Sequence, residues 1–357
     1  MSWVMFLVAT VLVLLSVWIV VPAPAIWAVA LSIGAAELSP VFLLVAALVG
    51  VLAWKIGGTM HTATMILAGI ATVLFALPVV RYPREAPFSI RRLITGIEAP
   101  GVQVHRGVRP EPSTSSALAM DIYQPATVEQ HPILVQVYGG AWQRGAPGDN
   151  PAFASYFASR GYTVFAIDYR HAPVSQWPAQ IDDVRAALAW IRAPAADYHG
   201  DATRLAIFGR SSGAQLAMLA GFQDSAVRAV ISYYGPVNLA RGWREPPSPD
   251  PIGSRPVLEA YLGGTPDQVP DRYAAASPIE HVSARVPPTL LIYGSRDHIV
   301  QAKYGRDLHA RLSAAGAKSQ LVEIPWADHA FDLIPGGLGS QLALWHTERF
   351  LEQTLRR

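Results

Sequence analysis

The sequence predicts an α/β fold, a mostly parallel β-sheet flanked by helices, preceded by an all-helical transmembrane region. The first 80 residues contain one acidic residue, Glu37, and one basic residue, Lys55, of the 26 and 28 in the chain. After residue 100, short apolar runs alternate with segments that have apolar residues at helical spacing. Runs without polar alternation are typical of strands buried on both faces of a parallel sheet. We therefore divide the chain into a membrane region (1–80), a linker (81–100) and an α/β domain (101–357).

The composition narrows the classes of function. The net charge of +2, with no basic stripe, gives no reason to expect a nucleic-acid partner. Cysteine is absent, which excludes disulfides, thiolate metal sites and a cysteine nucleophile but is compatible with any compartment.

Two uncharged runs of nineteen residues, 3–21 and 62–80, are each expected to form a membrane-spanning helix. At about 1.5 Å per residue, such a helix is nearly as long as the hydrocarbon core of a bilayer, roughly 30 Å. A cleaved signal peptide is the alternative for the first run, because Ala23-Pro24-Ala25 offers small residues at a suitable place. No Lys or Arg precedes the run and more apolar sequence follows it, which favours the spanning helix.

Residues 25–54 are apolar as well but are interrupted by Glu37 and by Ser39-Pro40. A helix over this whole stretch would extend about 45 Å, too long for one straight crossing. We expect a span at about 38–55, preceded by a shorter interfacial or re-entrant piece, and so three crossings; four crossings are the alternative. Glu37 is expected to be an interfacial carboxylate at a helix end, and a functional intramembrane carboxylate is the alternative.

Beyond the linker, predicted strands alternate with predicted helices. Val184, Leu188 and Ile191 have helical spacing, and so do Leu216 and Leu219. Strand, helix and strand in repetition is the pattern of an α/β fold. The predicted strands are 132–138, 162–168, 204–208, 229–233, 289–293 and 320–324.

Residues 209–213, G-R-S-S-G, follow one of these strands and precede a helix expected to begin at about Ser212. A serine with glycines two residues before and after it fits a strand-to-helix elbow, and only Ser211 has that spacing. The elbow needs neighbours without bulk, and it presents the hydroxyl beside a helix N-terminus, which favours developing negative charge. Ser211 is therefore the predicted nucleophile.

A serine hydroxyl needs a base to take its proton and a carboxylate to orient that base. Asp297 comes just after one predicted strand and His329 just after the next, at the edge where parallel strands collect functional side chains. The predicted catalytic residues are therefore Ser211, Asp297 and His329, in that chain order. Three neighbouring residues are the alternatives: His298, Asp328 and Asp332.

The stretch 139–142, G-G-A-W, directly follows the first of the predicted strands. Its small residues allow backbone N–H groups to approach a substrate closely, as an oxyanion hole requires. The amide of Ser212, which follows the predicted nucleophile, would supply the partner donor. An ordinary strand-end turn is the alternative for the Gly-Gly pair alone.

Five motifs together resemble the hormone-sensitive-lipase-like carboxylesterases of the α/β-hydrolase fold, which carry an H-G-G-G or H-G-G-x-W motif. The resemblance covers about residues 100–355. It implies that Gly140 and Ala141 join Ser212 as oxyanion donors and that 168–173 is a structural support loop. The motifs are Y-G-G-A-W (138–142), D-Y-R-H-A-P (168–173), G-R-S-S-G (209–213), Y-G-S-R-D (293–297) and D-H-A-F (328–331).

Tyr138 takes the place of the family's histidine at the head of the oxyanion motif. That position commonly braces the loop, and since tyrosine can still form hydrogen bonds, we expect altered geometry with activity retained. Tyr138 and Trp142 are the residues expected to bind the substrate. The membrane region lies outside the family's core domain and resembles that of the anchored esterases in the group.

The predicted function is that of a membrane-anchored serine carboxylesterase or lipase acting on small-molecule or lipid esters, with the bilayer as a partner and no metal or organic cofactor. Residues 236–287 form an insertion rich in Pro, Arg and aromatic residues, a candidate cap over the acyl pocket. The alternative is a surface insertion that does not contact the substrate. Acyl transfer or peptide hydrolysis is a second hypothesis for the function, and a non-catalytic binding protein on the same fold is a third.

The positive charges near the spans predict which side of the membrane the α/β domain faces. Arg81, Arg84, Arg91 and Arg92 lie within about 15 residues of the last span, where Lys and Arg determine orientation. In a three-span arrangement the opposite side has only Lys55. We therefore expect a cytoplasmic α/β domain and an external N-terminus; four spans would place the N-terminus inside as well.

Overall fold

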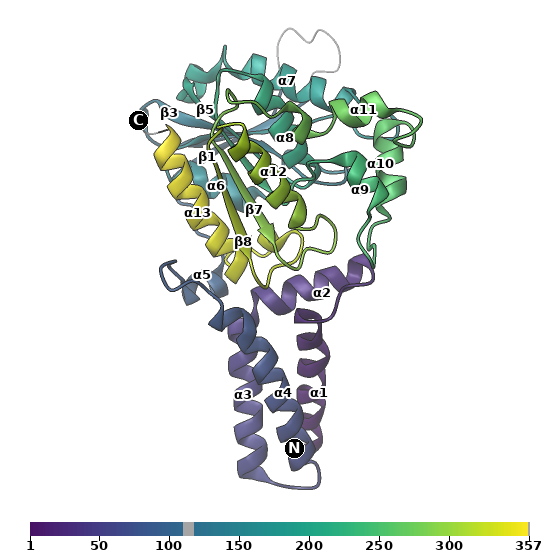
Figure 1. Ribbon diagram of the computed structural model, residues 1–357. Helices are drawn as coiled ribbons and strands as arrows, with labels where there is room; N and C mark the ends of the chain where they lie inside the picture. Colours follow the sequence, from purple (N-terminus) through teal and green to yellow (C-terminus); the bar gives the residue numbers. More distant parts are fainter. Residues whose placement is uncertain (110–117, 356–357) are drawn as a thin grey trace.

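The computed structural model describes residues 1–109 and 118–355. An α/β domain lies at one end of the molecule and a helical bundle extends away from it (Figure 1). The N-terminus lies near the far end of that bundle. Residues 110–117 and 356–357, which fall in the expected α/β domain, lie outside the described residues.

Three helices of the bundle are long and apolar enough to cross a membrane. Alanines are buried where these helices meet, among them Ala9, Ala46 and Ala71. Such small residues let helix backbones approach closely, as in the packing of membrane helices. The three helices are α1 (Ser2–Ser16, continued by the 3₁₀ turn Val17–Ile19), α3 (Ser39–Ile56) and α4 (His61–Val80).

The segment expected to form an interfacial or re-entrant piece before the second span contains helix α2 (Ile26–Glu37). Its 12 residues would extend only about 18 Å, too short to cross a bilayer. In Figure 1 it lies between the bundle and the α/β domain and runs across the bundle. One side of α2, with Ala28, Val29 and Ile33, packs against Ile299 and against the 330–334 segment of the α/β domain. The helix therefore joins the two parts of the molecule.

Within the described residues the α/β domain contains one eight-stranded sheet, in the order β1-β2-β4-β3-β5-β6-β7-β8. The strands from β4 to β8 pair in parallel, whereas β1 and β2 pair antiparallel at one edge. This confirms the predicted fold class. The strands are β1 (Val102–Val108), β2 (Met120–Pro125), β3 (His131–Val137), β4 (Thr163–Ile167), β5 (Gly200–Arg210), β6 (Val227–Tyr233), β7 (Thr289–Gly294) and β8 (Ser319–Ile324).

Helices cover the sheet and bury its apolar residues. The hydroxyl of Tyr156 on α6 donates a 2.8 Å hydrogen bond to Glu348 on α13, so these two helices lie together. The insertion 236–287 folds into short helices of its own. The sheet-covering helices are α6 (Pro151–Ser159), α7 (Ala179–Ile191), α8 (Ser212–Gln223), α12 (Lys303–Ala314) and α13 (Leu338–Leu355), and the insertion contains α9 (Leu239–Arg244), α10 (Ser254–Leu262), α11 (Pro270–Ala275) and the 3₁₀ turn Pro278–His281. Two further 3₁₀ turns are Ala195–Tyr198 and Phe331–Leu333.

The segment 81–100, expected as a linker, is packed against the α/β domain. It contains the short helix α5 (Ile90–Thr95). The backbone N–H and C=O of Ser89 both bond to the side-chain amide of Gln341, at 2.8 and 3.0 Å. The Tyr82 ring stacks on Trp326 with centroids 5.9 Å apart. These contacts hold the last helix of the bundle close to the start of α13.

The carboxyl ends of the parallel strands face the bundle. Ile299 follows β7 and Ala330 follows β8, and both contact the surface of α2. In parallel α/β sheets, functional side chains gather at this edge. The edge where the sequence places its candidate residues therefore lies next to the proposed membrane region.

Candidate active site

Ser211 occupies a strained turn between the last residue of β5 and the first residue of α8. Its backbone has φ 50° and ψ −123°, a conformation that residues with a side chain rarely adopt. The flanking residues must be glycine because there is no room for a side chain. A Cβ on Gly209 would lie 2.3 Å from the carbonyl oxygen of Gly213, and a Cβ on Gly213 would lie 2.1 Å from the carbonyl oxygen of Tyr138. The turn is the elbow that the G-R-S-S-G spacing predicts.

His329 connects Ser211 to Asp297 through hydrogen bonds. Its Nε2 lies 3.0 Å from Ser211 Oγ, and its Nδ1 lies 2.8 Å from Asp297 Oδ2. The other carboxylate oxygen of Asp297, Oδ1, accepts the backbone N–H groups of Ile299 and Val300 at 2.8 and 2.7 Å. The structure thus brings together the three residues that the sequence places on separate loops.

The environment of Asp297 affects its proton affinity. The residue is buried, and this burial raises its pKa, although the neighbouring His329 partly offsets the effect. The hydrogen bonds from Ile299 and Val300 hold the carboxylate in one orientation. His329 therefore faces a carboxylate that is both buried and immobilised.

Asp328 and His298, two of the alternatives considered from the sequence, form a second pair beside the first. Asp328 Oδ2 lies 2.7 Å from Nδ1 of His298. Its Oδ1 accepts the backbone N–H groups of His298 and His329, at 3.1 and 2.7 Å. The Asp328 carboxylate therefore holds the His329 backbone, while its side-chain partner is His298.

Asp332, the remaining alternative, pairs with the residue that precedes Ser211. Arg210 Nε donates to Asp332 Oδ2, and both side chains are buried. The Tyr234 hydroxyl donates to Asp332 Oδ1, and the Tyr234 ring lies 4.5 Å from the His329 ring. The Arg210 guanidinium also lies 4.4 Å from the ring centre of Phe153. Asp332 therefore supports both the Ser211 turn and the His329 ring.

Arg210 and Tyr234 were missed by the sequence reasoning. The available signal for Arg210 was a charged residue beside the predicted nucleophile, two positions after the apolar run L-A-I-F of the predicted strand. Its partner Asp332 lies 122 residues away in the chain, and no local pattern connects the two.

The stretch after β3 forms a tight loop beside Ser211. Gly140 has φ 146°, and Ala141 has φ 56°, in the left-handed region. A Cβ on Gly139 would lie 2.9 Å from the carbonyl oxygen of Arg210, so the loop and the elbow are in close contact. Gly140 and Ala141 line a cavity together with Ser211, and the N–H of Ser212, as the first residue of α8, has no acceptor within its own helix.

Tyr138 lies beneath this loop with only 1% of its surface exposed. Its hydroxyl donates to Asp168 and lies 2.9 Å from Nε2 of His171. Its ring stacks on Tyr169, with centroids 4.5 Å apart, and burial raises the Tyr138 pKa. Tyr138 does not line the described cavities around Ser211, and its hydroxyl bonds and ring contacts are with the 168–173 segment.

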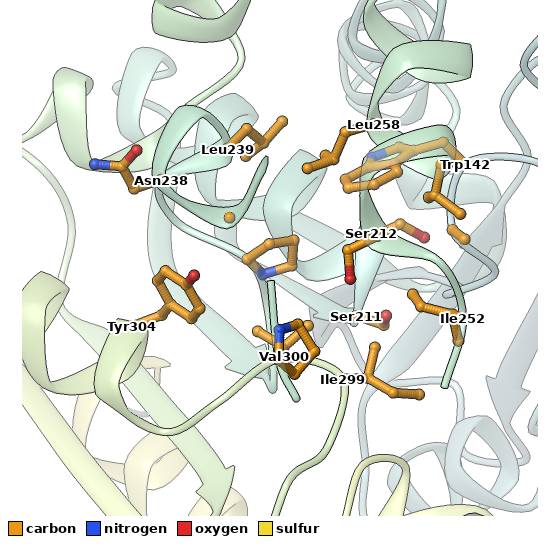
Figure 2. Close-up of a pocket in the computed structure, with 16 residues that line it drawn as sticks. Trp142, Ser211, Ser212, Asn238, Leu239, Ile252, Leu258, Ile299, Val300 and Tyr304 are labelled. Carbon is orange, nitrogen blue, oxygen red and sulfur yellow. The ribbon is translucent and has the colours of Figure 1, made fainter. Parts of the chain in front are cut away.

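Two cavities meet at Ser211. The first, which we call the cap cavity, encloses about 610 Å³ of empty space, part of it open to solvent. Figure 2 shows Leu239, Leu258 and Val300 around it, with Ser211 and Ser212 at one side. Nine of the 16 residues that line it belong to the insertion 236–287: Pro236, Asn238, Leu239, Gly242, Pro247, Ile252, Ser254, Val257 and Leu258.

Trp142, which is expected to bind the substrate, lines the cap cavity. Its indole stacks on Tyr261 of the insertion at 4.2 Å, and its Nε1 donates a 2.9 Å hydrogen bond to Gln215 on α8. Trp142 therefore connects the loop after β3 to the insertion.

The second cavity, which we call the α2 cavity, lies on the side of the bundle. It is lined by Ser211 and His329, by Gly139, Gly140 and Ala141, and by Ile26 of helix α2. Its empty space is about 780 Å³, part of it open to solvent. The cap cavity and the α2 cavity share Ala141, Ser211, Ile252 and Ile299 as lining residues.

Two of the curated proteins that are similar to this chain are named as ester hydrolases. Esterase LipC of Mycobacterium tuberculosis is 35% identical over 223 residues, covering 57% of this chain and 54% of LipC. The probable carboxylic ester hydrolase LipM of the same organism is 34% identical over 240 residues, covering 63% of this chain and 54% of LipM. The chain thus spans about half the length of these curated relatives.

Solved structures share the fold. A truncated carbohydrate esterase from gut microbiota is 25% identical with a TM-score of 0.61, covering 73% of this chain and all of that one. A bacterial heroin esterase, at 23% identity, has a TM-score of 0.64 and covers 75% of this chain and 89% of that one. The model of the BD-FAE family matches residues 120–312, from β2 into α12 and so across the elbow and Asp297. Since this match covers more than half of the chain, the protein belongs to the BD-FAE family of α/β-hydrolases.

Proposed function

We propose that the protein is a membrane-anchored serine carboxylesterase or lipase that hydrolyses carboxylic esters through a covalent acyl-enzyme. The observation that carries this proposal is the position of His329, within hydrogen-bonding distance of Ser211 and Asp297 at once. The names of the curated relatives, esterase and carboxylic ester hydrolase, favour ester hydrolysis over acyl transfer or peptide hydrolysis. The motif resemblance to hormone-sensitive-lipase-like carboxylesterases agrees with this choice.

In the proposed reaction, Ser211 Oγ attacks the carbonyl carbon of the ester while Nε2 of His329 takes the hydroxyl proton. The tetrahedral intermediate collapses, the bond to the alcohol oxygen breaks, and His329 gives its proton to the departing alcohol. Water then attacks the acyl-Ser211 ester, with His329 again accepting the proton. Breaking of the acyl bond releases the carboxylic acid and returns the proton to Ser211.

Two groups stabilise the charges that develop. Asp297 holds Nδ1–H of His329 and so favours the tautomer whose Nε2 can accept the serine proton, and it stabilises the imidazolium. The backbone N–H groups of Gly140, Ala141 and Ser212 would bind the oxyanion, and each such donor is worth about 2.7–4 kcal/mol in the transition state. No metal or organic cofactor has a part in this sequence of steps.

Trp142 and the insertion 236–287 would contact the substrate in the cap cavity, which makes the insertion a functional cap. Tyr138, in contrast, would act on the substrate indirectly. Its hydroxyl bonds to Asp168 and His171 hold the start of the loop that carries Gly140 and Ala141. This is the bracing role expected for the residue in the histidine position of the motif.

The bundle would anchor the domain in a membrane as a three-span, multi-pass region. The support is the length and apolar composition of α1, α3 and α4. The α/β domain would lie on the cytoplasmic side, since Arg81, Arg84, Arg91 and Arg92 lie at its end of the bundle.

The function is tested with Ser211→Ala and Ser212→Ala in the detergent-solubilised full chain. Ser211→Ala should lower ester turnover by about 10⁶-fold and abolish labelling by a fluorophosphonate, because the catalytic residues act as a unit. Ser212→Ala should lower ester turnover much less, because the group of Ser212 that is proposed to act is its backbone amide. Equal losses in the two variants would show that Ser211 is not the nucleophile.

A further inference from the structure

We infer that the ester substrate is dissolved in the bilayer and reaches Ser211 from the membrane through the α2 cavity, between Ile26 and Leu333. This inference rests on the proposed function, since it assumes ester hydrolysis at Ser211 and a bundle inserted in lipid. It goes further by assigning a class of substrate, a long-chain ester that stays in the membrane, and an entry route.

The first support is the direction in which the site faces. The loops after β7 and β8, which carry Asp297 and His329, pack on α2, and α2 lies across the bundle (Figure 1). In a membrane, the level of α2 would be the lipid–water interface, because α1 ends just before it and α3 begins just after it. The α2 cavity would therefore open at the membrane surface.

The second support is the chemistry of the cavity wall on that side. Ile26 and Leu333 both line the α2 cavity, and 49% and 58% of their surfaces are exposed. Trp27, next to Ile26, is also 58% exposed. Exposed apolar residues with an indole among them are typical of a segment in contact with lipid at the interface. An alkyl chain could pass from lipid along Ile26 and Leu333 without crossing water.

The third support is the amphipathic character of the route. Arg144 and Asn150 also line the α2 cavity and offer polar groups to the head of an amphiphilic ester. Beyond Ser211, the cavity continues into the apolar cap cavity, with Leu239 and Leu258 in its wall (Figure 2). The shared lining residue Ser211 lies where an ester bond between a polar head and an apolar chain would be placed.

The test uses the full chain reconstituted in vesicles of ether-linked phosphatidylcholine, which contains no ester to compete. The probes are 4-methylumbelliferyl oleate, which stays in the membrane, and 4-methylumbelliferyl acetate, which is water-soluble and has the same leaving group. The oleate ester is supplied either in the same vesicles as the protein or in separate vesicles. Entry from the bilayer predicts an initial rate at least about tenfold higher in the same vesicles. Equal rates would mean delivery through water and would overturn the inference.

A second arm tests the route with Ile26→Asn and Leu333→Asn. Each should lower the ratio of oleate to acetate turnover by about tenfold. Leu31→Asn is the matched control, because Leu31 is on the same helix and is 39% exposed but does not line the α2 cavity. Its ratio should remain that of the natural chain, and an equal fall in all three variants would contradict the route.

The two proposals fail differently in this experiment. If the natural chain hydrolyses neither ester and does not react with a fluorophosphonate, the proposed function is wrong. If it hydrolyses the acetate ester and the ratio does not respond to Ile26→Asn or Leu333→Asn, only the entry route is wrong. Fluorophosphonate labelling of each variant verifies that its active site is folded.

Discussion

The Glu37 carboxylate at the end of α2 accepts a 2.6 Å hydrogen bond from the backbone N–H of Gly339 at the start of α13. The N–H of Ser340 donates to the same oxygen at 3.2 Å. A Cβ on Gly339 would lie 2.6 Å from the other carboxylate oxygen, so a side chain there would displace the carboxylate. Glu37 is fully buried, and the helix N-terminus favours its negative charge. The carboxylate expected at a helix end therefore fastens α2 to the α/β domain.

Replacing Glu37 by glutamine should remove a pH dependence from the stability of the full chain. Burial raises the pKa of Glu37 to about 8, although the N–H groups of Gly339 and Ser340 act in the opposite direction. Because the pKa is raised in the folded state, proton binding to Glu37 stabilises the fold. This stabilisation is complete below about pH 4.5 and is lost as the pH rises through about 8. Thermal unfolding of the detergent-solubilised protein measures the effect.

Between about pH 6 and pH 9, the free energy of unfolding of the natural chain should fall by on the order of 2 kcal/mol more than that of Glu37→Gln. This corresponds to a difference of about 4–8 °C in Tm. Parallel Tm curves for the two proteins would show that Glu37 does not titrate in this range.

Asp297→Asn should lower kcat by about 10⁴-fold, as expected when the histidine takes the wrong tautomer. The N–H groups of Ile299 and Val300 already bond to Oδ1 and would keep the amide oxygen there, so the amide NH₂ would face Nδ1 of His329. His329 would then carry its proton on Nε2 and could not accept one from Ser211. Asp328→Asn is the matched control. Its kcat should fall by less than about tenfold, because an amide oxygen can still accept the hydrogen bond from the His329 backbone N–H. A larger fall in kcat for Asp328→Asn than for Asp297→Asn would mean that Asp328 is the carboxylate that orients His329.

Tyr138→Phe should lower turnover by no more than about tenfold and leave fluorophosphonate labelling of Ser211 intact. The change removes the hydroxyl bonds to Asp168 and His171, worth about 1 kcal/mol each, and keeps the ring stack on Tyr169. Turnover and labelling are measured on the same preparation. Loss of labelling would mean that Tyr138 shapes the nucleophile itself.

Protease added to intact cells should leave residues 100–357 undigested, because the α/β domain is predicted to be cytoplasmic. The four arginines between 81 and 92 lie at the domain end of the bundle, whereas Lys55 lies near the end of α3, at the far end. Lysed cells are the control and should show digestion. Digestion of the domain without lysis would place it outside and reverse the predicted orientation.

The elbow and six of the eight strands in the described sheet could be predicted from the sequence, because each depends on neighbouring residues. Gly209 and Gly213 mark the turn at Ser211, and mostly apolar runs rich in β-branched or aromatic residues mark the six strands from β3 to β8. The antiparallel strands β1 and β2 were not predicted. In β1, Val102–Val108, polar residues alternate irregularly with apolar ones, and most of its positions are exposed, so no clear period marks it as a strand.

Contacts between distant segments could not be predicted. Glu37 and Gly339 are separated by 302 residues, and Arg210 and Asp332 by 122. Periodicity indicates which side of a helix is apolar but not which surface covers it. The position of α2 over the loop of His329, and with it the α2 cavity, depends on the shapes of segments that are remote in the chain.

A fragment that begins after α4 would dissolve more readily but would no longer represent the protein. Without α2, the surface of Ile299 and Ala330 would be open to water, and Ile26 would be missing from one wall of the cavity that contains His329. The first N–H groups of α13 would also lose Glu37. Chain-length preferences measured on such a fragment would describe a wider, wetter entrance, so substrate screens for this protein need the whole chain in a lipid environment.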